Sequence, residues 1–217
     1  MVADRDAFEA EYGTDFPIGG EFSGSLDNDG EQLTLRDASG AGILDFTYND
    51  SSAWPVEADG NGPSLVLRAP GQPSDLNDPL NWRDSTEAGG NPASSDATTF
   101  TGNPAADQDQ DGMEALFEYA LGTSDTVPGS PAGLLLPDLQ SDGHLTITIR
   151  TNLLASDLAD SLEHSGDLLS WSPLSGFNPS EIRRDAANGT ALIVYRSRKP
   201  VPSGPQRDFL RRRVTKR

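Results

Sequence analysis

Short stretches in which apolar and polar residues alternate are the main pattern of this chain. Two of them, at 33–35 and 44–48, are separated by a turn rich in Gly, Ala and Ser. A period of two is typical of a strand with one buried face, so these stretches predict a β-hairpin. A third strand is predicted at 65–67, with Trp54 and Trp82 as further core anchors. The alternating apolar positions of the hairpin are Leu33, Leu35, Leu44, Phe46 and Tyr48.

The same alternation returns in the C-terminal part of the chain. In the first stretch three aliphatic residues alternate with Thr and Arg, which predicts a half-buried strand. Three consecutive arginines, Arg211 to Arg213, interrupt the alternation of the last stretch, so the sequence leaves open which of its faces is buried. The predicted strands lie at 145–149, 161–164, 191–195 and 209–214.

Two short helices are predicted beside these strands. Apolar positions spaced three and four residues apart at 113–121 predict an amphipathic helix that ends at Gly122. Residues 1–13 have the pattern of a short amphipathic helix and not of a signal peptide. Two stretches of small and polar residues, 86–106 and 125–133, predict linkers.

Composition supports a mainly β fold. Of 217 residues, 35% are hydrophobic, 22 are Gly and 16 are Pro, which favours short strands and many turns. The absence of Cys excludes disulfides, thiolate zinc sites and thiol nucleophiles. No apolar run approaches the length of a membrane span, so none is predicted. If the protein is secreted, its export signal is expected to lie outside this chain.

Charge is distributed unevenly along the chain, whose formal net charge is −18. Residues 1–125 carry 25 acidic and 4 basic residues, a net charge of −21, while 126–217 carry 9 acidic and 12 basic residues, a net charge of +3. An acidic surface repels nucleic acid and anionic membranes and suits a calcium-containing extracellular medium. The basic run from Arg207 to Arg217 is therefore interpreted as a solvated terminal strand that pairs with acidic modules, and no nucleic-acid partner is expected.

Residues 107–118 match the twelve-residue calcium-loop pattern D-x-[DN]-x-[DN]-G-x5-E at every specified position. Ca²⁺ prefers about six to eight oxygen ligands, and this spacing can supply most of them. Gly112 permits the sharp turn of such loops, and Ala115 has no ligand atom, so a water would complete the shell. The predicted metal ligands are Asp107, Asp109, Asp111, the Met113 carbonyl and a bidentate Glu118.

This loop is expected to act alone. The preceding residues 97–104 disfavour a helix, and Glu114 stands where paired calcium loops have an apolar residue. The segment 107–123 resembles the single calcium loops of dockerin and thrombospondin type 3 repeats. We expect the weak affinity typical of extracellular modules, a Kd of roughly 10⁻⁴ to 10⁻³ M, so that Ca²⁺ about tenfold above Kd would stabilise the fold by about 1.4 kcal/mol. The alternative interpretation is a solvated acidic linker.

Residues 1–95 resemble the C-terminal part of a bacterial lamin tail domain. The resemblance implies an immunoglobulin-like β-sandwich with a binding or structural role and no catalysis. The strands with which that family begins are missing before Val2, so this module is expected to be a fragment with exposed sheet edges. The features that carry the resemblance are Asp6 to Phe8, Tyr12-Gly13, Phe22 to Leu26, Gly30 to Leu35, Phe46 to Tyr48, Trp54-Pro55, Asp59-Gly60, Gly62 to Leu65 and Asn81-Trp82.

Residues 131–217 are similar, more loosely, to the small β-sandwich that closes many large bacterial surface proteins after a single calcium loop. The expected fold is therefore mainly β. It comprises a partial immunoglobulin-like β-sandwich at 1–95, a linker at 96–130 that carries the calcium loop and one short helix, and a second small β-sandwich at 131–217.

Motifs for catalysis are not found. His144 and His164 lack the spacing of a zinc helix, and hydrolase elbows, P-loops and dinucleotide fingerprints are missing. The predicted function is a non-catalytic, calcium-stabilised tail of a secreted or cell-surface bacterial protein, for adhesion, spacing or anchoring.

Two alternatives stay open. The chain could be the accessory C-terminal region of a larger secreted enzyme, whose catalytic domain would lie elsewhere. It could instead be a polysaccharide-binding module, which predicts an exposed row formed by Trp54, Trp82 and Trp171. The expected partners are Ca²⁺ and a cell-surface protein or polysaccharide.

Overall fold

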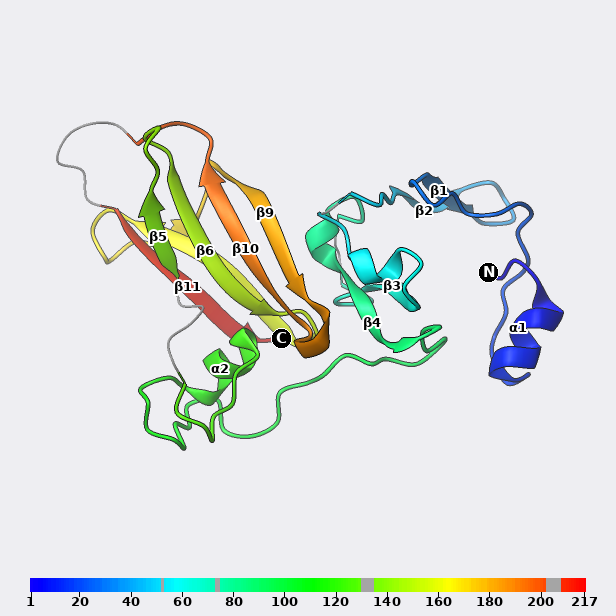
Figure 1. The fold of residues 1–217 in the computed structure, drawn as a ribbon, viewed down its shortest axis with the longest axis horizontal. Coiled ribbons are helices and arrows are strands. Elements are labelled where there is room, and N and C mark those ends of the chain that lie inside the picture. Colours follow the sequence, from blue (N-terminus) through cyan, green and yellow to red (C-terminus); the bar gives the residue numbers. More distant parts are fainter. Residues whose placement is uncertain (52, 73–74, 130–134, 202–207) are drawn as a thin grey trace. The chain divides into compact units, whose positions relative to one another are not determined.

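The computed structural model describes residues 1–51, 53–72, 75–129, 135–201 and 208–217. The chain is mainly β, as the sequence predicts, and its contacts divide it into two compact units, Met1–Asp96 and Ala97–Arg217 (Figure 1). In the part of the chain that the structure describes, no helix combines the length and the apolar character that crossing a membrane requires.

The first unit contains two antiparallel strand pairs and an N-terminal helix in its described residues. Helix α1 begins after Asp4, whose side chain accepts a hydrogen bond from the Ala7 amide. Strand β1 pairs with β2, and β3 pairs with β4. The elements are α1 (Arg5–Tyr12), β1 (Gln32–Arg36), β2 (Gly42–Thr47), β3 (Pro63–Leu67) and β4 (Trp82–Ala88), with short 3-10 helices at Val56–Ala58 and Pro79–Asn81.

The predicted hairpin is confirmed, with Leu33 opposite Phe46 on the face that forms the core. The rings of Phe46 and Trp82 stack with centroids 5.1 Å apart, and Trp54 lies 6.1 Å from Trp82. The predicted core role of both tryptophans is thus confirmed. Strand β4 was not predicted as a strand, and it runs into the stretch interpreted as a linker, because pairing with β3 outweighs its polar composition.

A buried ion pair joins β4 to the end of the first unit. The Arg83 side chain is buried, and its two terminal nitrogens donate to the Asp96 carboxylate, in one case over 3.0 Å. The Thr86 amide donates to the same carboxylate over 2.7 Å. The hydrogen bond and charge of Arg83, with the Thr86 bond, lower the pKa of Asp96 to about 2 against the opposing effect of burial. The pair therefore fixes the end of this unit on β4.

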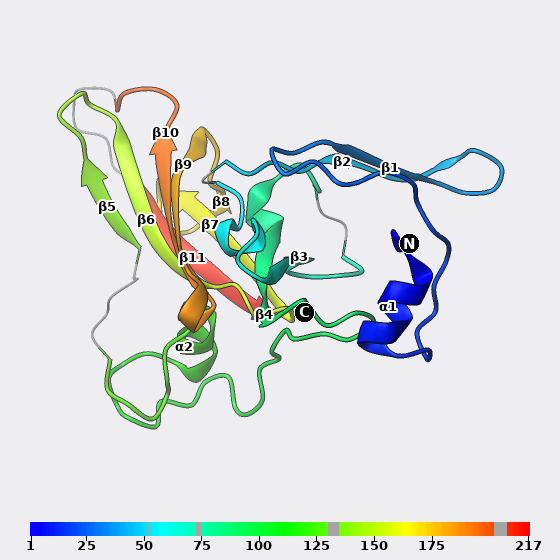
Figure 2. The ribbon, with the colours of Figure 1, turned by 45° about the vertical axis from the view of Figure 1, so that its right-hand side comes forward.

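The second unit is built from two antiparallel sheets, which Figures 1 and 2 show as two layers. One sheet has the order β5-β6-β10-β9 and the other β11-β7-β8. The buried residues include Ile147, Ile149 and Ile193 on the first sheet and Leu158 on the second. The elements are α2 (Ala115–Leu121), β5 (Leu136–Leu139), β6 (Leu145–Asn152), β7 (Leu158–Ser165), β8 (Ser172–Pro173), β9 (Phe177–Asp185), β10 (Thr190–Ser197) and β11 (Phe209–Lys216), with a 3-10 helix at Ala186–Asn188.

In strand β11, buried and exposed side chains alternate even through the three consecutive arginines. Arg212 lies opposite Leu162, and only 2% of its side chain is exposed, whereas Arg211 and Arg213 are 42% and 60% exposed. The interpretation of this run as a solvated strand is therefore wrong for Arg212. Arg207, the first residue of the run, lies outside the described residues.

Replacing Asp96 by Asn is expected to lower the free energy of unfolding of the first unit by about 3–5 kcal/mol at pH 7, because Arg83 stays buried without a counter-charge. The pKa of Asp96 falls on folding from 3.8 to about 2. The stabilisation is thus fully present above the unfolded-state pKa and is lost as the pH falls through about 2. Hydrogen exchange of the β3 and β4 amides in the full chain measures both effects.

The matched control is Asp50→Asn, which removes an exposed carboxylate from the same unit. Wild-type protection is expected in this control at every pH. If the β3 and β4 amides of Asp96→Asn were equally protected at pH 7, the ion pair would not be what holds this end of the unit.

Candidate metal centre

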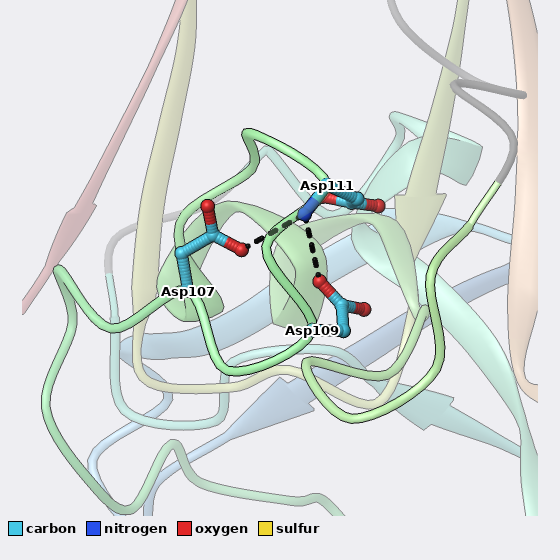
Figure 3. A group of neighbouring side chains, drawn as sticks. All are labelled: Asp107, Asp109 and Asp111. Carbon is cyan, nitrogen blue, oxygen red and sulfur yellow. Dashed lines mark hydrogen bonds between the residues drawn. The ribbon is translucent and has the colours of Figure 1, made fainter.

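Three aspartates lie close together in the loop that precedes α2 in the sequence. Asp107, Asp109 and Asp111 each place one carboxylate oxygen within 4.8 Å of the others. Figure 3 shows these three side chains. Two oxygens bound to one Ca²⁺ lie at most about 5 Å apart, because each Ca–O distance is about 2.3–2.6 Å. The structure thus brings together three of the five predicted ligands at a spacing that suits one cation.

Short-range hydrogen bonds curl this loop. The Asp111 amide donates to Asp107 Oδ1 and to Asp109 Oδ1, each over 3.2 Å (Figure 3). The Gly112 amide donates to Asp107 Oδ2 over 3.1 Å. Gly112 has a φ of +92°, a conformation that a side chain strongly disfavours. The spacing of aspartates and glycine in the sequence therefore produces the turn that gathers the carboxylates.

Glu118, the last predicted ligand, is fully buried on α2. Its Oε1 accepts a hydrogen bond from Thr123 Oγ1 over 3.2 Å, and its Oε2 has no hydrogen-bond partner among the described residues. Burial raises the pKa of Glu118, and the charges of Asp109 and Asp111 raise it further. Glu118 is not one of the three carboxylates within 4.8 Å, but two of them, Asp109 and Asp111, act on it through their charges.

Asp109, like Glu118, has a buried carboxylate oxygen and lies close to other negative charges. Its Oδ2 is buried without a hydrogen-bond partner in the described chain. Burial, together with the charges of Asp111 and Asp107, raises the pKa of Asp109. Two carboxylate oxygens of the predicted ligand set are therefore desolvated without a donor, although such groups are normally satisfied.

The start of α2 differs from the prediction by two residues. The Met113 amide donates to Asp111 Oδ1 over 2.9 Å, so Met113 belongs to the loop, and the helix begins at Ala115 with Glu114 as its N-cap. The Met113 N–H thus lies against the aspartate cluster, whereas the carbonyl predicted as a ligand belongs to the next peptide unit. The predicted stop is confirmed, because Gly122 takes the left-handed conformation, with a φ of +70°.

Two residues that the sequence did not single out close the loop from the C-terminal side. Asp125 accepts hydrogen bonds from the amide and the side chain of Gln108, over 3.0 and 2.5 Å. The Gly129 amide donates to Asp111 Oδ2 over 3.0 Å. The sequence predicts a linker at 125–133. The described part of this stretch, 125–129, instead packs on the loop, and residues 130–133 lie outside the described residues. Only the closeness of Asp125 and Gly129 to the calcium-loop motif in the sequence could have indicated this role.

Helix α2 is tied to both sheets of the second unit. The Asn152 side chain donates to the Tyr119 carbonyl over 3.0 Å. Arg212 donates to the Asp160 carboxylate over 2.9 and 2.5 Å, to the Arg150 carbonyl over 2.6 Å, and to the Ala120 carbonyl over 3.4 Å. The helix that carries Glu118 thus connects the loop to both sheets of the sandwich through hydrogen bonds.

The other residues considered from the sequence do not gather at this site. His144 Nδ1 lies 2.8 Å from the Ser197 carbonyl, and His164 Nδ1 lies 3.4 Å from Asp208, on the other sheet. Trp54 and Trp82 are buried, whereas Trp171 is half-buried beneath the Arg211 guanidinium, whose carbon is 4.1 Å from the ring centroid. Two of the three tryptophans therefore cannot contribute to an exposed aromatic row.

Comparison of the chain with protein-family models, curated proteins and solved structures gives no match. The resemblance of residues 1–95 to lamin tail domains therefore stays a prediction, and so do the calcium-loop and surface-protein resemblances.

Replacing Gly122 by Ala is expected to destabilise the second unit by about 1–3 kcal/mol, because of backbone strain and overpacking. A Cβ at this position would lie 2.5 Å from the Thr190 methyl carbon, and the φ of +70° disfavours a side chain. Calorimetric melting of the full chain measures the effect. Adding Thr190→Ser, which removes that methyl group, should restore part of the loss.

Gly166→Ala is the matched control, since Gly166 has no positive φ and no atom within 4 Å of an added Cβ. Its melting temperature should stay close to that of the wild type. If Gly122→Ala melts no lower than this control, the close approach of α2 to β10 does not constrain the unit.

Proposed function

We propose that residues 97–217 form a non-catalytic module whose loop binds one Ca²⁺ through Asp107, Asp109, Asp111, the Met113 carbonyl and Glu118. The observation that carries this proposal is the Glu118 carboxylate, which is fully buried and has one oxygen without a hydrogen-bond partner in the described chain. An unpaired buried carboxylate is strongly destabilising. A cation held beside it by three aspartates would supply the missing counter-charge.

The chemistry of the ligand set favours a hard cation. The five ligands offer only carboxylate and carbonyl oxygens, which suit Ca²⁺, Mg²⁺ or Mn²⁺ and not soft thiolate-seeking metals. Mg²⁺ requires near-ideal octahedral geometry and keeps several waters, whereas Ca²⁺ accepts irregular cages with more oxygens. A twelve-residue loop ending in a bidentate Glu fits Ca²⁺ better.

The ion would act as a clip between the loop and the sandwich. Without a cation, the aspartates repel one another and Glu118 keeps an uncompensated charge, so the loop and α2 lose stability. With the ion, this contribution reaches the sheets through Tyr119 and Ala120, whose carbonyls are bonded to Asn152 and Arg212. At Ca²⁺ about tenfold above Kd, linkage gives only about 1.4 kcal/mol, which is a structural effect more than a signal.

A weak calcium site suits a medium in which Ca²⁺ is abundant. A Kd of roughly 10⁻⁴ to 10⁻³ M matches extracellular modules. The net charge of −18 agrees with such a medium. We therefore propose a tail of a secreted or cell-surface bacterial protein, used for adhesion, spacing or anchoring, with the lamin-tail-like first unit in a binding or structural role.

Calorimetric titration of the full chain with CaCl₂ is expected to give about one equivalent of bound ion. Asp107→Ala and Glu118→Gln should each remove this binding, because each deletes a charged ligand. Glu114→Gln removes an exposed charge beside the same helix and should bind like the wild type. Absence of binding by the wild type at about 10 mM Ca²⁺, far above the expected Kd, would reduce the loop to an acidic linker and sink the proposal. Tighter binding of Mg²⁺ would reassign the ion.

Thermal melting of Glu118→Gln provides a second test, because the expected effect of the substitution on stability differs between EDTA and Ca²⁺. In EDTA the variant should melt no lower than the wild type, because an amide is cheaper to bury than an unpaired carboxylate. In Ca²⁺ the wild type should gain stability and the variant should not. A variant that melts far below the wild type in EDTA would mean that the Glu118 charge is already compensated within the protein.

A further inference from the structure

A basic pocket lies on one face of the β5-β6-β10-β9 sheet, apart from the aspartate loop. Its volume is about 410 Å³, within the range of small-molecule sites. Among the described residues, its lining consists of three arginines, two threonines, Asp185 and the apolar residues Leu136 and Leu192. In a chain with a net charge of −18, a concave surface with several guanidinium groups calls for an explanation.

The register of three neighbouring strands creates this pocket. Leu192 on β10 pairs with Arg150 on β6 and also with Arg183 on β9. Directly paired residues of antiparallel strands face the same side, so the two arginines flank Leu192 on one face, their Cα atoms about 10 Å apart. The strands that carry these residues can be followed in Figure 1.

Two arginines of the lining, Arg150 and Arg183, can bind a ligand. Arg150 is half-buried, its Nε has no hydrogen-bond partner, and no carboxylate pairs with it among the residues that the structure describes. Arg183 pairs with Glu181 over 2.7 Å, but both side chains are more than half exposed. Such an exposed pair is worth at most about 1 kcal/mol, so an anionic ligand can replace Glu181.

Asp185, the single acidic residue among the described lining residues, is already hydrogen-bonded within the protein. Its Oδ1 accepts a hydrogen bond from the Asn188 amide over 3.3 Å, and its Oδ2 accepts one from the Asn188 side chain over 2.8 Å. This carboxylate caps the short helix at Ala186–Asn188. Arg150 and Arg183 together outnumber this one carboxylate in the lining.

We infer that this pocket binds a carboxylated sugar of an acidic polysaccharide. A planar guanidinium such as that of Arg150 binds a carboxylate through two parallel hydrogen bonds. The Thr148 hydroxyl, also in the lining, can bond a sugar hydroxyl, while Leu136 and Leu192 suit the apolar face of a pyranose ring. The inference rests on the proposed adhesive function for the kind of ligand.

An acidic polysaccharide fits these features better than an acidic peptide segment. One rigid sugar ring presents a carboxylate, hydroxyls and an apolar face together, so it loses less conformational entropy on binding than a flexible Glu side chain. A polymer also repeats its carboxylates, so that several copies of this module on one surface would bind with high avidity.

Calorimetric titration of the full chain with trigalacturonate, in NaCl and a fixed low concentration of Ca²⁺, tests the inference. Arg150→Gln and Arg183→Gln are each expected to weaken binding roughly tenfold to a hundredfold, the effect of losing a hydrogen bond between charged groups. Arg198→Gln removes the same charge outside the pocket, where the side chain bonds Asn178, and should change the affinity less than about twofold. Neutral trigalactose should not bind.

The outcomes separate the alternatives. No binding of trigalacturonate, or equal loss of affinity in all three variants, would overturn the pocket. Triglutamate binding as tightly as trigalacturonate would replace the sugar by an acidic protein segment. Arg183 is 62% exposed, so Arg183→Gln keeps the test valid if Arg150→Gln fails to fold. The calcium titration uses other variants, Asp107→Ala and Glu118→Gln, and another ligand, so failure of the calcium proposal and failure of this one are told apart.

Discussion

One buried arginine holds the second unit together. The Arg212 side chain extends from β11 to Asp160 on β7, to the Arg150 carbonyl on β6 and to the Ala120 carbonyl on α2. It thus contacts both sheets and the helix at once. A guanidinium is suited to this position, because its donors lie in a fixed plane and keep their charge at any pH of interest. A Lys could not make the same set of bonds.

The same physical rule explains why Glu118 matters. A buried charge is tolerated when an opposite charge and hydrogen bonds surround it, as for Arg212 with Asp160 and for Arg83 with Asp96. Glu118 has Thr123 as a hydrogen-bond donor but is surrounded by acidic neighbours. Like Asp109 Oδ2, its Oε2 is buried without a hydrogen-bond partner among the described residues. The proposed cation would bring Glu118 under that rule.

The two proposed binding sites carry charges of opposite sign and are formed by different parts of the structure. The acidic loop gathers its carboxylates through bonds between near neighbours in the sequence, and it is connected to the sandwich through α2. The basic pocket gathers arginines from separate strands on one face of a sheet. In both places the described charges are incompletely neutralised by the protein itself. Each site therefore has a free-energy reason to take a ligand of the opposite sign.

The sequence by itself determined the features that depend on near neighbours. Period-two alternation located the β1–β2 hairpin and strands β6, β10 and β11, and the spacing of aspartates around Gly112 located the loop. Only the tertiary structure decided which arginine of β11 is buried, that Asp125 closes the loop, and that Arg150 and Arg183 share a face. Strands β4, β5 and β9 were also missed, because their polar residues show no alternation and they are strands only through pairing with a neighbour. The reason is physical: covalent spacing fixes local turns and faces, whereas strand register and burial are set by contacts between residues far apart in the chain.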